Sequence, residues 1–266
     1  MIISYELNPP KILPNNYFSY SNLLSNIENV KKKVMILDEY INCLHFTDSV
    51  LGIPRLSSIT MASIIKKYNA KMKISCSIRT RDRNLISMYQ TISDSILLNI
   101  ESLLIILGDQ PRNDLESQEL GDQPRNDLES QELLKPSKVV NQLNSQEFNR
   151  LIKLNLSIPN KIRNINTIKR KIDAKPNAFV TQSIESLTDL ENIIDQIRPF
   201  DIKVVACIMV PSEKNKKSAD LIGLNWKEYE KEPIEFIKNS GKIADEVLIT
   251  SPNHFVLATE ILKELK

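Results

Sequence analysis

The sequence predicts one α/β domain folded as a closed (β/α)8 barrel, also called a TIM barrel. Short apolar runs rich in isoleucine and valine recur along the whole chain, as expected of parallel strands that are buried on both faces. Longer stretches of helical period separate these runs in strict alternation, which is the pattern of βα units. The length of 266 residues allows either one large domain or two small ones, and eight strands alternating with eight helices make one barrel. We therefore treat residues 1–266 as a single domain.

Eight apolar runs qualify as strands because each is short, rich in branched aliphatic residues and bounded by polar or turn residues. They lie at residues 2–6, 41–46, 71–77, 102–107, 150–156, 178–182, 202–208 and 246–250. The stretches between them repeat apolar residues at helical spacing. These predicted helices lie at residues 21–37, 56–68, 83–98, 136–145, 162–174, 186–197, 231–243 and 254–265.

One segment is duplicated without change. GDQPRNDLESQEL occupies residues 108–120 and again 121–133, and such a unit is too short for a solenoid repeat. Only the first copy follows the fourth strand directly. We therefore expect Asp109 at the mouth of the barrel, with the second copy lengthening a surface loop at small entropic cost.

Composition excludes several classes of function. The chain has 35 basic and 33 acidic residues with no long basic stripe, so neither nucleic acid nor a membrane surface is the expected partner. No apolar run approaches the roughly 20 residues of a membrane span, and the N-terminus lacks the features of a signal peptide, which favours the cytoplasm. The five glycines never form the spacing of a Rossmann or P-loop phosphate site. Three scattered cysteines and two histidines predict no disulfide framework and no metal site.

Catalytic residues of these barrels lie at the carboxyl ends of the strands. Glu6 is the foremost candidate, because it lies within an apolar strand and precedes Asn8, Pro9 and Pro10. Its carboxylate would project into the barrel mouth, where desolvation raises the pKa toward that of a general acid.

Several segments resemble one family in order along nearly the whole chain. SYELNPPK at 4–11 is similar to the opening motif of the methylenetetrahydrofolate reductases. Further similar segments lie at 46–65, 80–111, 168–182, 208–226 and 244–253. The resemblance implies an enzyme that reduces a 5,10-methylene-tetrahydropterin, either tetrahydrofolate or an archaeal analogue, to the 5-methyl form by hydride transfer from reduced FAD. NAD(P)H is then the candidate source of electrons for the flavin.

The resemblance also implies roles for individual residues. Glu6 matches the general acid that protonates a pterin nitrogen, and Asp109 matches an aspartate beside the flavin and the pterin. Gln182 in VTQ matches a pterin-binding glutamine, and Asn253 is expected at the substrate near the end of the eighth strand. The expected flavin contacts are Thr47, Ser77, Gly108, Asp109 and Lys171.

Departures from the family pattern concern the flavin. Ser77 stands where a histidine is usual, Leu107 replaces an arginine that some members carry, and Asn164 replaces an aspartate. The arginines at 79, 81 and 83 either hold a diphosphate or form a solvated face. An alternative function is therefore a flavin-free, pterin-binding subunit that works with a partner protein in methyl transfer. A homo-oligomer also stays open, whereas a proline dehydrogenase barrel is disfavoured by the SYELNPP and VTQ motifs.

Overall fold

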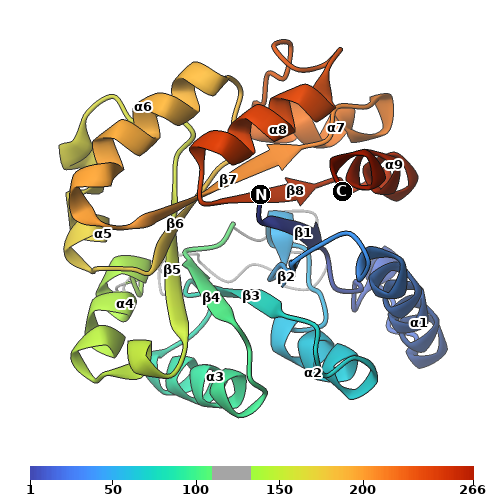
Figure 1. Ribbon diagram of the computed structural model, residues 1–266. Coiled ribbons are helices and arrows are strands. Elements are labelled where there is room, and N and C mark those ends of the chain that lie inside the picture. The colour runs from blue at the N-terminus through green and yellow to red at the C-terminus, as the bar shows by residue number, and fades with distance from the viewer. Residues whose placement is uncertain (110–132) are drawn as a thin grey trace, which may run out of the picture.

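A computed structural model describes residues 1–109 and 133–266 and confirms the predicted barrel (Figure 1). Eight parallel strands pair in chain order, and β8 pairs with β1 to close the barrel. The strands are β1 (Ile3–Leu7), β2 (Cys43–Phe46), β3 (Ile74–Arg79), β4 (Ser102–Ile106), β5 (Lys153–Ile158), β6 (Ala178–Thr181), β7 (Lys203–Met209) and β8 (Glu246–Thr250). Most of the second copy of the duplicated segment, residues 121–132, lies outside the described residues.

The helices surround the barrel in Figure 1. Within the described residues they are α1 (Tyr20–Leu37), α2 (Ser58–Tyr68), α3 (Leu85–Leu97), α4 (Pro136–Ser145), α5 (Lys169–Asp173), α6 (Leu187–Ile197), α7 (Glu213–Ile222), α8 (Pro233–Ile243) and α9 (Phe255–Leu265). The expectation of strict alternation is wrong at one place, because β7 and β8 are joined by both α7 and α8. The helix predicted at 162–174 is also shorter, since its first half is a loop and a 3-10 turn, Ile165–Ile168.

Two strands are shifted relative to the sequence prediction. β3 ends at Arg79 and not at Ser77, so Ser77 lies inside the barrel two residues before the strand ends. β5 begins at Lys153 because the chain before it turns through Glu147, whose φ is +64°. No helix in the described ranges is long and apolar enough to cross a membrane.

The interior of the barrel has an apolar and a polar part. Side chains alternate between the two faces of each strand. One inward-facing cluster is apolar and consists of Leu104, Ala178, Val180, Val205, Cys207 and Leu248. The inward-facing residues of β2 and β3 are polar instead. There the His45 ring lies between two hydroxyl groups, with Nδ1 2.8 Å from Ser75 Oγ and Nε2 2.8 Å from Ser77 Oγ. This triad fixes the imidazole in the middle of the barrel.

Candidate functional site

A cavity of about 730 Å³ opens at the carboxyl ends of β1, β6, β7 and β8. It brings together Glu6, Gln182 and Asn253, the three residues that the sequence placed at a pterin. They are far apart in the chain and become neighbours because all the strands of a parallel barrel end on the same face. The cavity is large enough for a small-molecule ligand.

Glu6 faces the cavity from β1, where its neighbours Tyr5 and Leu7 are buried. The parallel register sets Glu6 opposite Thr250 of β8. The Thr250 hydroxyl donates a hydrogen bond to Glu6 Oε1 at 2.8 Å. Burial raises the pKa of Glu6, and the hydrogen bond from Thr250 partly opposes that rise. Glu6 thus has the position and the electrostatics of a proton donor.

Gln182 and Asn253 offer amide groups to the cavity. Gln182 follows β6, and its exposed side chain has no hydrogen-bond partner among the described residues. Asn253 is oriented from two sides: its backbone N–H donates to Asn215 Oδ1 at 2.9 Å, and its Nδ2 donates to Ser218 Oγ at 2.9 Å. Both amides can donate and accept hydrogen bonds.

Cys207 also lines the cavity, from β7. Burial raises the pKa of its thiol to about 12. The group is therefore a neutral thiol at physiological pH and is not an activated nucleophile. No group of three histidine, cysteine or acidic side chains in the described ranges could hold a metal ion.

The expected flavin contacts do not line this cavity. Thr47 is buried and donates its hydroxyl proton to Asn8 Oδ1 at 2.7 Å. Ser77 is held by His45 inside the barrel. The Lys171 ammonium donates to the carbonyl oxygen of Ser157 at 2.6 Å, so it is directed at the protein backbone. Each group already has a partner within the chain.

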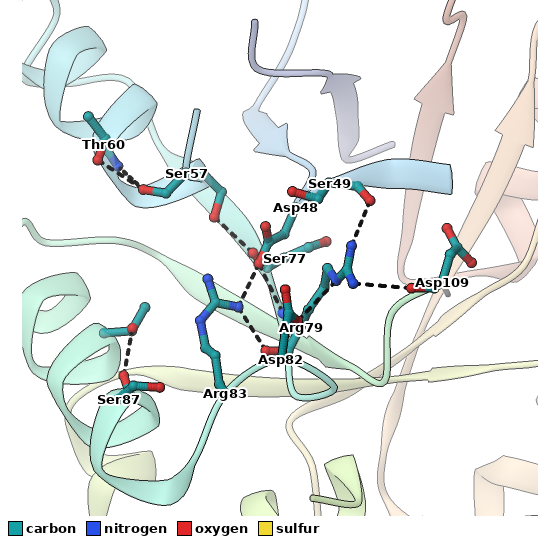
Figure 2. Close-up of polar contacts among 12 residues, drawn as sticks. Asp48, Ser49, Ser57, Thr60, Ser77, Arg79, Asp82, Arg83, Ser87 and Asp109 are labelled. Atoms are coloured by element: carbon teal, nitrogen blue, oxygen red, sulfur yellow. Dashed lines mark hydrogen bonds and ion pairs between the residues drawn. The ribbon is translucent and has the colours of Figure 1, made fainter. Parts of the chain in front are cut away.

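Arg79 fills the mouth of the barrel beside β2 and β4 (Figure 2). Its buried guanidinium donates to the carbonyl oxygens of Ser49 at 3.0 Å and Asp109 at 3.1 Å. Gly108 lies against this side chain. Asp109 is exposed, and its Oδ2 accepts a hydrogen bond from the Leu51 amide at 2.7 Å. Asp109 therefore holds the loop whose Leu51 side chain lines the cavity.

The other two arginines are also engaged with protein groups. Arg83 pairs with the buried Asp48 at 2.8 Å, as Figure 2 shows, and Arg81 donates to the carbonyl oxygen of Gly108 at 3.1 Å. Together with Thr47, Ser77 and Lys171, these contacts leave no set of free groups for a flavin on this side of the mouth. The residues present do not fit a flavin in this conformation.

Gly108 tests how closely this side of the mouth is packed. Its φ is +88°, and a Cβ at this position would lie 2.5 Å from Arg79 Nε. We expect backbone strain in Gly108→Ala to lower the free energy of unfolding by about 1–3 kcal/mol. The displacement of the Arg79 side chain should lower it further. Gly223→Ala is the matched control, since φ is +68° there but no atom of residues 1–109 or 133–266 lies within 4 Å of the added Cβ. Chemical denaturation measures the free energy of unfolding of both variants, and an equal loss in the two would contradict this close packing.

Comparisons with known proteins support the fold alone. No protein-family model matches the chain, and no curated protein matches it. Among solved structures it is similar to QR15, an aldolase, with 14% identity and a TM-score of 0.53 over 98% of this chain and 94% of that chain. It is also similar to tryptophan synthase from Pyrococcus furiosus, with 10% identity and a TM-score of 0.52 over 99% of this chain and 93% of that one. At such low sequence identity, the similarity shows that the chain has the (β/α)8 fold and indicates nothing about its activity.

Sequence reasoning missed part of the cavity wall. Ser218, Leu221 and Ile222 reach the cavity from α7, a helix that was not predicted. Its start could have been recognised, because Ser212 caps the helix and Glu213 follows in the first turn. The hydrogen bond from Thr250 to Glu6 depends on the pairing of β8 with β1 that closes the barrel.

Proposed function

We propose that the protein reduces a 5,10-methylene-tetrahydropterin to the 5-methyl form, with Glu6 as the general acid. The observation that carries the proposal is the convergence of Glu6, Gln182 and Asn253 on one cavity at the catalytic end of a barrel. The resemblance of the sequence to methylenetetrahydrofolate reductases supplies the reaction. The aldolase and the tryptophan synthase of similar fold are enzymes, which is in keeping with a catalytic role.

Glu6 would act on the methylene bridge. Its protonated carboxyl group gives a proton to one pterin nitrogen, and the bond between that nitrogen and the bridging carbon breaks with its electron pair going to the nitrogen. The carbon remains on the second nitrogen as an electrophilic iminium, which accepts a hydride. Burial raises the pKa of the carboxyl group and so favours the protonated form that this step needs, and the hydrogen bond from Thr250 stabilises the carboxylate that forms.

The source of the hydride distinguishes two candidate functions. The resemblance implies reduced FAD, but the groups expected to bind it are engaged within the protein. We therefore assign no step to a flavin held by this chain. The same observation favours a second candidate function, a flavin-free subunit that binds the pterin and works with a partner protein.

Gln182 provides a test of the pterin site. Because its amide is exposed to the cavity and has no partner in the described part of the chain, we expect Gln182→Ala to weaken binding of a reduced pterin about tenfold, the scale of one or two lost hydrogen bonds. Calorimetric titration with tetrahydrofolate measures this affinity. Gln196→Ala, in which the lost amide contacts Ile162 and Asn192, is the control. Equal affinity in both variants would remove Gln182 from the site.

Turnover tests the two candidates together. Purified protein is mixed anaerobically with methylene-tetrahydrofolate and either reduced FAD or NADH, and the 5-methyl product is measured. Product formed with reduced FAD or NADH alone supports the reductase. Binding of the pterin without product from any donor supports the partner-dependent subunit, and absence of pterin binding contradicts both.

A further inference from the structure

A second cavity, of about 410 Å³, opens at the end of the barrel opposite to Glu6. Its rim is formed by residues that begin a strand or directly precede one, among them Asn42, Lys73, Asn177, Lys203 and Glu246. Among the described residues, the two cavities have no lining residue in common. The apolar cluster of the barrel interior lies between them, because five of its residues line this cavity and the sixth, Cys207, lines the other. The two cavities are therefore distinct sites on opposite faces of the barrel.

One wall of this second cavity has charged groups at the rim and apolar groups deeper inside. Alternate residues of a strand face the same side of the sheet, so each inward-facing rim residue has a deeper neighbour two positions on. On β7 Lys203 is followed by Val205, and on β8 Glu246 is followed by Leu248. The adjacent strand β6 adds the apolar Val180. A ligand that fits this wall has a charged head at the rim and an apolar tail inside.

The wall on β2 and β3 is polar but uncharged. The His45 ring is already bonded to Ser75 and Ser77, and burial lowers its pKa to about 4, so the ring is neutral. Burial raises the pKa of the Cys43 thiol to about 11, so this group is also neutral. The charges that a ligand meets therefore lie at the rim.

Charges of opposite sign begin the neighbouring strands β7 and β8. The Ser4 hydroxyl donates to Glu246 Oε1, and Glu246 Oε2 has no partner among the described residues. Lys203 forms no ion pair within the described part of the chain. Burial raises the pKa of Glu246, and the nearby Lys203 is among the groups that oppose this rise. A head group with both an ammonium and a carboxylate would match these two side chains.

Hydrogen bonds to the backbone hold the rim in place. Asp245 Oδ2 accepts a hydrogen bond from the Val204 amide at 2.8 Å, which ties the start of β8 to the start of β7. Asn177 and Asn42 hold β5 and β1 in the same way, through hydrogen bonds of 2.7 Å and 2.8 Å. The backbone positions around the opening are therefore fixed before a ligand arrives, which reduces the free-energy cost of binding.

We propose that this second cavity binds a small α-amino acid with an aliphatic side chain. The ammonium group pairs with Glu246, the carboxylate pairs with Lys203, and the side chain lies against Val205 and Leu248. The volume of about 410 Å³ is near the lower end of the range for small-molecule sites and suits a ligand of this size. The inference does not depend on the reaction at Glu6, because it concerns the other face of the barrel.

Four probes test the head group and the tail separately. L-Leucine carries both charges and the aliphatic side chain. 3-Methylbutylamine is leucine without the carboxylate, 4-methylpentanoate is leucine without the ammonium group, and glycine has the head group alone. In calorimetric titrations of the unaltered protein, we expect L-leucine to bind saturably and about tenfold more tightly than each of the other three, which lack one charged group or the apolar contact. Equal affinity for L-leucine and any of these three probes would contradict the proposal.

Two variants test whether the amino acid lies in this cavity. Glu246→Gln keeps the shape of the side chain and can still accept the hydrogen bond from Ser4, and Lys203→Gln changes an exposed side chain, so both proteins should fold. Each should bind L-leucine about tenfold more weakly, the scale of one lost charge-assisted hydrogen bond. Glu6→Gln changes the glutamate of the other cavity, and Lys238→Gln changes an exposed position of α8 outside both cavities. These two controls should bind L-leucine as the unaltered protein does.

Three results would overturn the proposal. L-Leucine does not bind to the unaltered protein, it binds equally well to Glu246→Gln and Lys203→Gln, or its affinity falls in Glu6→Gln alone. The last result would place the amino acid in the other cavity.

Discussion

Glu6→Gln is expected to lower the rate of methylene reduction about a hundredfold or more, which is the usual effect of removing a general acid. The amide has the same shape as the carboxyl group and can still contact Thr250, so binding of the pterin should change little. Reduction by the unaltered protein should also fall as the pH rises through the elevated pKa of Glu6, because the protonated form is consumed. The variant should lack this limb of the pH profile.

Glu246→Gln is the matched control for this variant. Glu246 also faces the interior of the barrel from β8, and burial raises its pKa as well, but it lines a separate cavity that Glu6 does not line. Its replacement should leave the rate and its pH dependence unchanged. Steady-state kinetics of the two variants measure the rate of methylene reduction and its pH dependence. Full activity of Glu6→Gln would show that Glu6 is not the general acid.

The second large effect concerns stability in acid. Burial lowers the pKa of His45 from 6.5 to about 4, so the folded protein keeps this ring neutral. The unfolded chain takes up a proton near pH 6.5. Between these values the unfolded state binds more protons, so the contribution of His45 to stability is complete above pH 6.5 and is lost as the pH falls toward 4. The loss is about 3 kcal/mol over this range.

His45→Gln removes this dependence. Denaturation at several pH values should show that the difference between the two proteins shrinks as the pH falls from 6.5 to 4. The raised pKa values of Glu6 and Glu246 act in the opposite direction, but they are common to both proteins and cancel in the comparison. A curve for His45→Gln parallel to that of the unaltered protein would show that the ring does not stay neutral.

Much of the fold could be predicted because parallel barrel strands are buried on both faces and appear as apolar runs. The position of Glu6 could be predicted for the same reason, as an acidic residue within such a run. The helix α7 was not predicted, because only its residues Asn215 and Ala219 are buried and it therefore has no apolar stripe. Ser77 was expected at a strand end because the predicted third strand stopped at residue 77, whereas β3 continues to Arg79. The two terminal guanidinium nitrogens of Arg79 donate to the carbonyl oxygens of Ser49 and Asp109, each 30 residues away in the sequence.

The cavity itself could be predicted only in part. Glu6 lies in β1, Gln182 and Asn253 follow β6 and β8, and the topology of the barrel places strand ends together. The basic side chains that line the cavity, Lys11, Arg55, Lys161 and Lys217, come from loops and from α7. The positions of these loops and of α7 at the barrel mouth depend on tertiary packing. The same holds for the groups expected at a flavin, because their partners, such as Asn8 for Thr47, were not apparent from spacing.

The central claim is that the Glu6 cavity binds a reduced pterin. Calorimetric titration of the unaltered protein with tetrahydrofolate, repeated with Gln182→Ala and Glu6→Gln, tests it most directly. The account predicts saturable binding at one site per chain, weakened about tenfold by Gln182→Ala and nearly unchanged by Glu6→Gln. Absence of binding to the unaltered protein, or equal binding to all three proteins, would contradict it.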